Sequence, residues 1–363
     1  MNKRIYVCHT YYHVYVTFLK EFELQRAGHA PGEADIILST ISTDFENLKE
    51  RLEQSGVFKC VFMMDEKKDE FFPELAEYKK DRGNILLNLP QRIIYTKKRA
   101  KLLAPYVPVD FREYKDIYVF CDSDPIGYYL NWKHIYYHAM EDGLDCLKIL
   151  DAAHYDNRGH FKVKRWMSEH NLIFIQNGYG KYCLDMEIND ESCLKYHCPK
   201  YKVVPRHPLE KQLTSDQKSI MVHAFIEDAD SFLRSLEEKG QGDCTLFLTM
   251  PHPQSEEARK QICNDIIAQY CQGCHVIIKP HPRDLLDYAS LRPDCTVIKG
   301  KFPVEVLNFV EGVHFKRAIS IVTTALDTIE FADEKINLGE DFWDKYEDPD
   351  KHKYNKAIEK SIG

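Results

Sequence analysis

The chain lacks the features of membrane-spanning, exported and nucleic-acid-binding proteins. None of the apolar runs in its 363 residues approaches the roughly 20 residues that a helix needs to cross a bilayer. Residues 1–7 are too short and polar for a signal peptide and lead directly into a predicted strand, so we expect a cytoplasmic protein. The formal net charge of -8 disfavours nucleic acid as a partner, because such binding requires excess positive charge.

The twelve cysteines lack the paired spacing of a zinc ribbon or a disulfide framework. Most of them stand singly in apolar runs, where a free thiol behaves as a small hydrophobic side chain. Cys271 and Cys274 form a single Cys-x-x-Cys spacing, and no second pair accompanies it. We therefore predict neither a zinc site nor a redox function for these two residues.

What the sequence does contain is an alternation of short apolar runs with segments of helical spacing. This alternation predicts an α/β protein with two doubly wound, Rossmann-like domains that face each other. We predict domains over residues 1–150 and 215–335, joined by an irregular connection over 151–214. The aromatic segment within 336–363 is expected to dock back on the body. Predicted elements that matter below are a strand at 134–138 and helices at 304–312 and 327–332.

The most informative stretch is 276–284, which reads Val-Ile-Ile-Lys-Pro-His-Pro-Arg-Asp. An apolar run that ends in His-Pro places His281 at the carboxyl end of a buried parallel strand, where open α/β sheets bind ligands. Pro280 and Pro282 cannot continue the strand ladder, so His281 lies in a stiff turn. Lys279 and Arg283 flank it and favour an anion, with phosphate as the first candidate.

A second candidate site is Glu141-Asp142-Gly143, which follows another predicted strand. A carboxylate pair at a strand end, with glycine to turn the chain, suits a general base held at a ligand site. The alternative is an ordinary Asp-Gly turn.

Three further segments hold polar residues at the ends of strands or the starts of helices. Ser320, Thr323 and Thr324 combine hydroxyl groups with a helix start, which favours phosphate binding, although a threonine there also caps the helix. Glu305 lies in the first turn of a predicted helix, where it caps the helix or accepts from a ribose or base. Thr249 ends a strand whose loop is expected beside the His281 loop.

Two charged clusters complete the set. Asp122 and Asp124 have the Asp-x-Asp spacing of a divalent-metal site, and the flanking Pro125 and Gly127 also suit a plain turn. The basic residues Lys97, Lys98, Arg99 and Lys101 lie on a predicted helix, where they either contact anionic lipid or form a solvated face.

The order of these motifs resembles that of the bacterial sialyltransferases. Those enzymes have an acidic motif ending in glycine, then a His-Pro motif, then a Ser/Thr motif, which here are 141–143, 279–283 and 320–324. Pro303-x-Glu305 between the last two is similar to the same group. The sequence is most similar to the lipooligosaccharide and capsule enzymes of glycosyltransferase family 52 and to the neighbouring capsule polysialyltransferases.

This resemblance implies a GT-B fold with a cleft between its domains, CMP-sialic acid as the donor, and inverting transfer to a sugar hydroxyl. It implies no metal and no cofactor. His281 would stabilise or protonate the leaving phosphate, and Thr323 and Thr324 would bind its oxygens. Glu141 or Asp142 would act as the base, with Glu141 preferred. In the lipooligosaccharide branch the base lies shortly before the His-Pro motif, which makes Glu256 or Glu257 the second choice.

The resemblance also implies partners and a location. The acceptor is expected to be a galactoside-type hydroxyl of a bacterial surface glycan, lipid-linked, and reached at the inner face of the membrane. Two other functions remain open at this point. One is transfer from another nucleotide sugar with a metal at Asp122 and Asp124, and the other is a non-catalytic role in capsule assembly.

Overall fold

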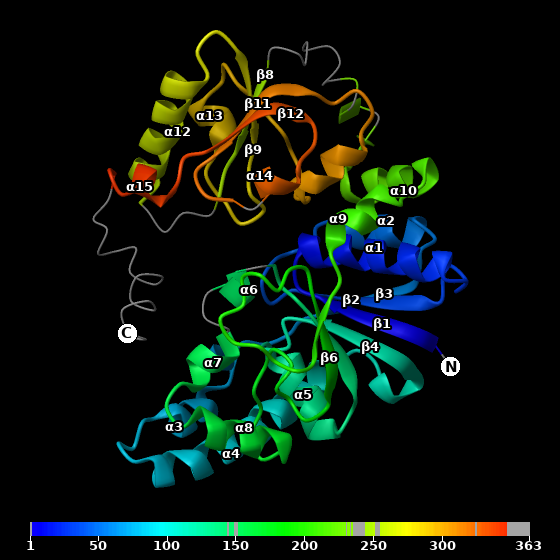
Figure 1. Cartoon of the computed structure of the whole chain (residues 1–363), viewed down its shortest axis with the longest axis vertical. Helices are drawn as coiled ribbons and strands as arrows, with labels where there is room; N and C mark the ends of the chain where they lie inside the picture. The colour runs from blue at the N-terminus through cyan, green and yellow to red at the C-terminus, as the bar shows by residue number, and fades with distance from the viewer. Residues whose placement is uncertain are drawn as a thin grey trace. The chain divides into compact units, whose positions relative to one another are not determined.

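The computed structural model describes residues 2–143, 145–148, 152–229, 231–232, 234, 244–250, 255–323 and 325–346. Its contacts divide the chain into two compact units, Met1–Gln212 and Leu213–Gly363. Each unit is built on one parallel β-sheet with helices packed against it (Figure 1). The predicted class of two Rossmann-like, doubly wound domains is therefore confirmed.

The first unit holds a seven-stranded parallel sheet in the order β3-β2-β1-β4-β5-β6-β7. The chain starts at β1 and winds outward in both directions, so the connections after β1 and β4 diverge. Such a switch point leaves a crevice at the carboxyl ends of the strands. The strands are β1 (Asn2–Cys8), β2 (Ala34–Ser39), β3 (Phe58–Met64), β4 (Tyr114–Phe120), β5 (Tyr137–Met140), β6 (Cys183–Ile188) and β7 (Tyr201–Val203).

Helices cover both faces of this sheet, with α1 and α2 on one side and α4 and α5 on the other (Figure 1). Strand β2 is buried along its whole length, as expected for a parallel strand covered on both faces. The main helices are α1 (Tyr11–Arg26), α2 (Leu48–Gln54), α3 (Ala76–Lys79), α4 (Ile85–Leu103), α5 (Pro125–Lys133), α6 (Asp145–Lys148), α7 (Ala152–Asn157), α8 (Phe161–Glu169) and α9 (Arg206–Lys211). Short 3-10 turns are η1 (Asp69–Phe71), η2 (Pro73–Leu75), η3 (Ala104–Tyr106) and η4 (Phe111–Glu113).

Local sequence explains where the helices beside the switch point begin. Thr10 follows β1 and caps α1, because its side chain accepts a hydrogen bond from the amide of His13. Pro125 occupies the first turn of α5, where its missing N–H costs nothing. Both helices therefore start directly beyond the carboxyl ends of β1 and β4.

The second unit holds a five-stranded parallel sheet in the order β10-β9-β8-β11-β12, with its switch point between β8 and β11. Its strands are β8 (Cys244–Leu248), β9 (His275–Lys279), β10 (Thr296–Val297), β11 (Phe315–Ser320) and β12 (Ala332–Asn337). Its helices are α10 (Ser215–Phe225), α12 (Glu256–Tyr270), α13 (Tyr288–Leu291), η6 (Val304–Phe309), α14 (Ala325–Thr328) and α15 (Glu340–Trp343).

One core joins the sheet of the second unit to α12 and to the last described residues. Phe247, Ile278 and Ile319 come from three strands and pack with Ile262 of α12. Phe342 of α15 is buried in the same core. The hydroxyl of Tyr346 donates to the carboxylate of Asp265 at 2.7 Å, so the segment up to residue 346 packs on this unit.

The segment 151–214 is not the irregular connection that the sequence predicts. It contains α7, α8 and α9, and β6 and β7 extend the first sheet. Strand β6 carries Asp185 and Glu187 in buried positions, which hides its strand pattern. Partners far away in the sequence make this burial possible: His138 bonds Asp185 at 2.7 Å, and Lys20 bonds Glu187 at 2.8 Å.

Three other predicted elements differ in the structure. The strand predicted at 134–138 begins only at Tyr137, because His134 adopts a left-handed conformation (φ 57°) and ends α5. The helix predicted at 304–312 is the shorter 3-10 helix η6. The helix predicted at 327–332 is wrong, since α14 ends at Thr328 and β12 begins at Ala332.

Two absences concern the described part of the chain. All twelve cysteines lie within it and none forms a disulfide. Among the same residues, no helix is both long enough and apolar enough to span a membrane.

Candidate active site

Two histidines lie at the switch point of the first sheet. His9 directly follows β1, and His13 lies one turn into α1. The backbone amide of His9 donates to Nδ1 of His13 at 2.9 Å. The His13 ring also stacks on Phe120 at the end of β4, with ring centroids 4.4 Å apart. Neither histidine side chain is exposed to solvent.

His13 fixes the position of Asp142, the second residue of the predicted acidic motif. Because Nδ1 of His13 accepts the amide of His9, the ring proton lies on Nε2, which donates to Oδ1 of Asp142. Burial lowers the pKa of His13 and keeps the ring neutral. Burial alone would raise the pKa of Asp142, but the contacts with His13 and Cys121 lower it to about 2. The Asp142 side chain is 41% exposed, so an ionised carboxylate faces solvent.

Glu141 has different surroundings, although it is the adjacent residue. It is only 1% exposed, and its Oε2 accepts the amide of Asn189 at 2.5 Å. Burial raises the pKa of this carboxyl. Glu141 therefore holds the strand ends β5 and β6 together, whereas Asp142 presents its carboxylate to solvent.

A third carboxylate at this edge, Glu66, has no counterpart in the sequence prediction. Its Oε2 bonds His9 Nε2 at 2.9 Å and accepts from Ser39 at 2.7 Å. Its Oε1 accepts the amide of Ile126 at the start of α5, at 2.6 Å. Burial alone would lower the pKa of His9, but Glu66 and then Asp124 raise it to about 8. His9 is therefore held charged between these two carboxylates near neutral pH.

Asp122 and Asp124 do not form the metal pair that their spacing suggests. Asp122 is buried and accepts from Tyr137 at 3.0 Å and from the amide of Asn177 at 2.9 Å. Asp124 instead faces His9, whose Nε2 lies 3.6 Å from its Oδ2. Burial raises the pKa of each carboxyl to about 6. The two side chains thus serve different hydrogen-bond networks.

Another group at this edge has the composition of a metal site. One ligand atom from each of His9, His13 and Cys121 lies within 4.8 Å of the others. However, both ring nitrogens of His13 already have partners, the amide of His9 and the carboxylate of Asp142. A metal would have to displace one of these bonds. We interpret the group as the hydrogen-bond network that orients Asp142.

In the second unit, His281 follows β9 and is held by its neighbours. Its amide donates to the hydroxyl of Thr249 at 3.1 Å, and its Nδ1 accepts the amide of Arg283 at 3.1 Å. The ring proton therefore lies on Nε2. Pro282 lies between His281 and Arg283, and Arg283 is exposed. Thr249, predicted to bind the donor, thus positions the His281 loop.

Asp284 organises this loop, and the sequence analysis assigns it no function. Its fully buried side chain accepts from Thr249 and from Tyr288, each at 2.6 Å, and faces Arg259 at 3.3 Å. These contacts tie the loops after β8 and β9 to α12 and α13. The signal in the sequence is the acidic residue that follows Pro282-Arg283, in a turn otherwise free of acids.

Lys279 does not stand beside His281 as an exposed cation. Its side chain is 3% exposed, and its Nζ lies 4.2 Å from the ring centre of Phe302. Burial lowers its pKa to about 7, although nearby Glu305 opposes this shift. Within the loop, Arg283 is therefore the exposed positive charge.

The hydroxyl groups predicted to bind phosphate have mixed surroundings. Ser320 is fully buried and donates to the carbonyl of Leu248 at 3.0 Å, which is a contact inside the sheet. Thr323 accepts the amide of Ala325 at 3.2 Å and so caps α14. Thr324 lies outside the described residues. Glu305 accepts from Thr328 at 3.3 Å, which joins η6 to α14.

Glu256 and Glu257, the second choice for the base, lie in the first turn of α12. Both are exposed, and Glu256 pairs with Lys260 at 2.5 Å. In the described part of the chain, no hydrogen bond or ion pair joins either residue to the His281 loop. Their carboxylates suit the amino end of the helix dipole.

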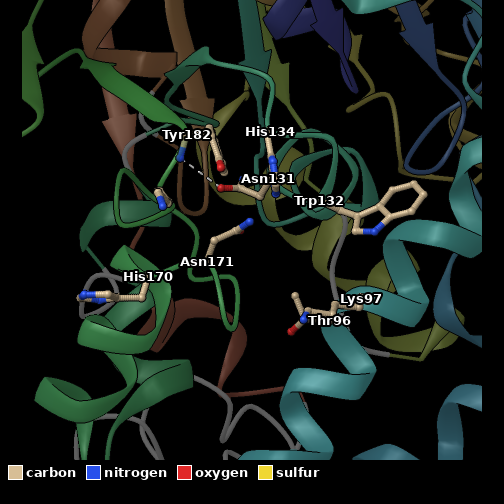
Figure 2. A pocket seen from close by; sticks show the side chains of 9 residues that line it. Thr96, Lys97, Asn131, Trp132, His134, His170, Asn171 and Tyr182 are labelled. Carbon is tan, nitrogen blue, oxygen red and sulfur yellow. Dashed lines mark hydrogen bonds between the residues drawn. The ribbon is translucent and has the colours of Figure 1, made fainter.

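A pocket of the first unit lies at the opposite edge of its sheet (Figure 2). Thr96 of α4 and Asn131 of α5 line it, together with Asn171 after α8 and Tyr182 before β6. Oδ1 of Asn131 accepts the amide of Tyr182 at 3.2 Å, drawn as the dashed line in Figure 2. Because β5 and β6 start here, the pocket lies at their amino ends and contains none of the residues predicted to be catalytic.

These features define an α/β protein with two Rossmann-like sheets, each with polar residues at the carboxyl edge, where such sheets bind ligands. The chain belongs to glycosyltransferase family 52, which matches residues 39–338. The match covers most of the chain and confirms the resemblance to the bacterial sialyltransferases.

Similarity to solved structures concerns the fold. The α/β-galactoside α-2,3-sialyltransferase of Photobacterium phosphoreum is 12% identical, with a TM-score of 0.52 over 93% of this chain and 91% of that one. The GT-B domain of a sialyltransferase from Photobacterium damselae is 11% identical, with a TM-score of 0.48 over 100% and 96% of the two chains. The first of these similarities agrees with the predicted GT-B class.

A relative with closer sequence is an uncharacterized protein of Haemophilus influenzae. It is 32% identical over 101 residues, which are 27% of this chain. The match spans 32% of the length of that relative.

Proposed function

We propose that this protein is an inverting sialyltransferase that moves sialic acid from CMP-sialic acid to a sugar hydroxyl of a glycan. Membership of family 52 supports the donor and the reaction class. The observation that carries the mechanism is the solvent-facing Asp142 carboxylate held by the Nε2 proton of His13. A galactoside-type hydroxyl of a lipid-linked surface glycan is the acceptor we expect.

Asp142 is the base in this proposal, in place of Glu141. A sugar hydroxyl has a pKa far above neutral, so it must lose its proton to a positioned carboxylate as its oxygen attacks. Oδ1 of Asp142 is engaged by His13, and the exposed remainder of the carboxylate is open to the acceptor. Its low pKa keeps it ionised throughout the pH range near neutrality. Glu141 is buried and satisfied by a backbone amide.

His281 acts on the leaving group. As the acceptor oxygen bonds to the anomeric carbon, the bond from that carbon to the phosphate oxygen breaks and its electron pair leaves with CMP. A donor fixed at that oxygen stabilises the developing charge. Nε2–H of His281 suits this function because Nδ1 is held by the amide of Arg283. The exposed Arg283 adds positive charge beside it.

The reaction balances without a metal ion. The acceptor proton passes to Asp142, and the phosphate charge is met by His281 and Arg283. Inversion requires base and leaving group on opposite faces of the sugar, and we propose that one unit supplies each. A location in the cytoplasm, with contact at the inner face of the membrane, also remains a proposal.

The first experiment is to incubate the purified protein with CMP-sialic acid and follow CMP release, with EDTA present and with or without lactose. Release in EDTA that lactose accelerates supports a metal-independent sialyltransferase. CMP binding without any release supports a non-catalytic capsule-assembly protein. If neither release nor thermal stabilisation by CMP occurs, the donor assignment is wrong and other nucleotide sugars must be tested.

A further inference from the structure

The pocket of Figure 2 is lined by positive and neutral side chains in a chain that is negative as a whole. Helices α4 and α5 contain no acidic residue, and α4 contains five basic ones. Lys97 of α4 and Lys181 before β6 both line the pocket and are exposed. Among the described residues neither lysine has an ion-pair partner. In α8 the one acid, Glu169, is held by Arg165 at 2.8 Å. The pocket therefore attracts anions.

Aromatic rings form one wall of the pocket. Trp132 is partly exposed, with the Nζ of Lys133 4.5 Å from its ring centre. The rings of His134 and Tyr182 stack with centroids 5.0 Å apart. Next to them Tyr136 is 59% exposed and packs against Tyr182. Exposed flat rings beside hydrogen-bonding groups suit the apolar face of a sugar ring.

The floor of the pocket offers a polar group that the protein does not use. The hydroxyl of Thr96 is buried, the residue is 9% exposed, and this oxygen has no hydrogen-bond partner in the described structure. A buried hydroxyl without a partner is costly unless a ligand or water satisfies it. Figure 2 shows the amide of Asn171 directed toward the space between Asn131 and Thr96. The unpartnered Thr96 hydroxyl and the Asn171 amide thus belong to residues that line the same pocket as the two lysines.

We propose that this pocket binds an anionic saccharide group at a second site, apart from the site of transfer. The lysines would pair with a carboxylate or phosphate on the sugar, Trp132 would pack on its ring, and Thr96 and Asn171 would bond its hydroxyls. A flat anionic membrane explains the basic residues of α4 but not the buried hydroxyl and amides inside a concavity. Strand β6 has six residues, so the two edges of the sheet lie roughly 20 Å apart at about 3.3 Å per residue.

Such a site would hold one end of a charged glycan while the other end of that glycan is modified at Asp142. This consequence rests on the proposed function. Holding one part of an acceptor raises the effective concentration of the rest at Asp142. The effect would lower KM for long anionic acceptors and leave lactose unaffected. Binding itself does not depend on transferase activity, so its test is independent of the proposed reaction.

The test uses the full chain with Trp166→Phe and Trp343→Phe, which leaves Trp132 as the single tryptophan. Its fluorescence is titrated with sialyllactose against lactose, and with glucose 6-phosphate against glucose. We expect a saturable change with at least one anionic sugar and none with its neutral counterpart; the responding sugar identifies carboxylate or phosphate as the anion. Lys97→Gln with Lys181→Gln should weaken that binding about tenfold, or about 1.4 kcal/mol.

Lys115→Gln is the control for loss of a surface lysine, to be compared with Lys97→Gln and Lys181→Gln made singly, because Lys115 is exposed at the start of β4 and lies outside the pocket. Its affinity should equal that of the parent protein. Equal binding of neutral and anionic sugars, or undiminished binding by the double variant, would overturn the proposal. So would absence of any sugar response together with lysine-dependent binding to phosphatidylglycerol vesicles, which would assign the basic residues to a membrane surface.

Discussion

Asp142 and Glu141 are adjacent residues, yet one faces solvent and the other lies in the sheet edge. The difference follows from their partners. His13 lies on α1 and holds Asp142 at the switch point, whereas the amide of Asn189 binds Glu141 beneath the surface. Burial raises the pKa of Glu141, while its contacts lower that of Asp142 to about 2. Of the two, only Asp142 presents its carboxylate to solvent, where an acceptor hydroxyl can reach it.

We predict that Asp142→Asn lowers kcat by about 10²–10⁴-fold, the usual contribution of a general base. CMP binding should be unchanged, because the nucleotide is expected on the second unit. The measurement is the rate of CMP release with lactose at saturation. Glu141→Gln, Glu256→Gln and Glu257→Gln are the controls and should keep most of the turnover. A loss in Glu257→Gln or Glu256→Gln that matches Asp142→Asn would move the base to α12.

The raised pKa of His9 makes the stability of the first unit depend on pH. A histidine whose pKa is higher in the folded state stabilises that state fully at pH values below its pKa in the unfolded chain, which is about 6.5. This stabilisation is lost as the pH rises through the folded-state pKa of about 8. At about 1.4 kcal/mol per pKa unit, the free energy of unfolding should fall by about 2 kcal/mol between pH 6 and pH 9. His9→Gln should remove this fall.

Urea unfolding followed by tryptophan fluorescence measures this effect. A Trp343→Phe background leaves Trp132 and Trp166, both in the first unit, as the reporters. The control is His223→Gln, an exposed histidine on α10 of the second unit, which should keep the parental pH dependence. A fall of the same size in His9→Gln would show that another group is responsible.

At the scale of residues, the sequence predicts the site only where its members are close in the chain. Asp142 and His281 are singled out by the sequence because acids before glycine and His-Pro after an apolar strand are local patterns, and their functions remain proposals. His9 and His13 are also four residues apart at a strand–helix junction, a signal that sequence analysis can use. Glu66 gives no such signal, since Ser39, His9 and Ile126 reach it from three other segments.

Among the elements, the end of β9 shows how a loop is held by its neighbours. Thr249 directly follows β8 and bonds both the amide of His281 and the carboxylate of Asp284. Asp284 in turn binds Tyr288 of α13 and faces Arg259 of α12. The Thr249 hydroxyl therefore joins the ends of β8 and β9, and through the Asp284 carboxylate it is linked to α12 and α13.

We predict that Thr249→Val lowers kcat about tenfold, because valine keeps the shape of threonine but removes the hydroxyl that fixes His281. The expected change is in kcat more than in KM for the acceptor, since His281 acts on the leaving group. Thr249→Ser retains the hydroxyl and should retain near-normal turnover. If the serine and valine variants lose activity equally, the methyl group and its packing, rather than the hydrogen bonds, position the loop.

Elements with a clean apolar pattern could be predicted, and elements with buried charge could not. The β9 strand before His281 has an apolar run over 276–278 and appears where the sequence places it. Strand β6 is not apparent from the sequence because its interior acids bond His138, Lys202 and Lys20, which no local pattern links to it. Strand β12 is not apparent from the sequence because Asp333, Glu334 and Lys335 are exposed on an edge strand, where polar residues are tolerated.

The whole molecule repeats one architecture with different chemistry at each switch point. The first sheet presents a carboxylate oriented by a neutral histidine, and the second presents a histidine with an exposed arginine. Composition and alternation predict two such domains, but not that the first sheet continues past residue 150. This boundary depends on the pairing of β5 with β6 and of β6 with β7, which is a tertiary property.

This difference between the units yields a prediction for the intact protein. CMP should slow amide hydrogen exchange in the loops after β8, β9 and β11, which meet at the carboxyl edge of the second sheet. Peptides that contain His281 and Thr323 should be protected, and those that contain His9 and Asp142 should not. Cytidine is the matched ligand, because it lacks the phosphate that His281 and Arg283 are proposed to bind. It should leave the His281 peptide unprotected. If CMP protected peptides of the first unit alone, the nucleotide would bind at the first sheet. The proposed assignment of His281 to the leaving group and of Asp142 to the base would then be wrong.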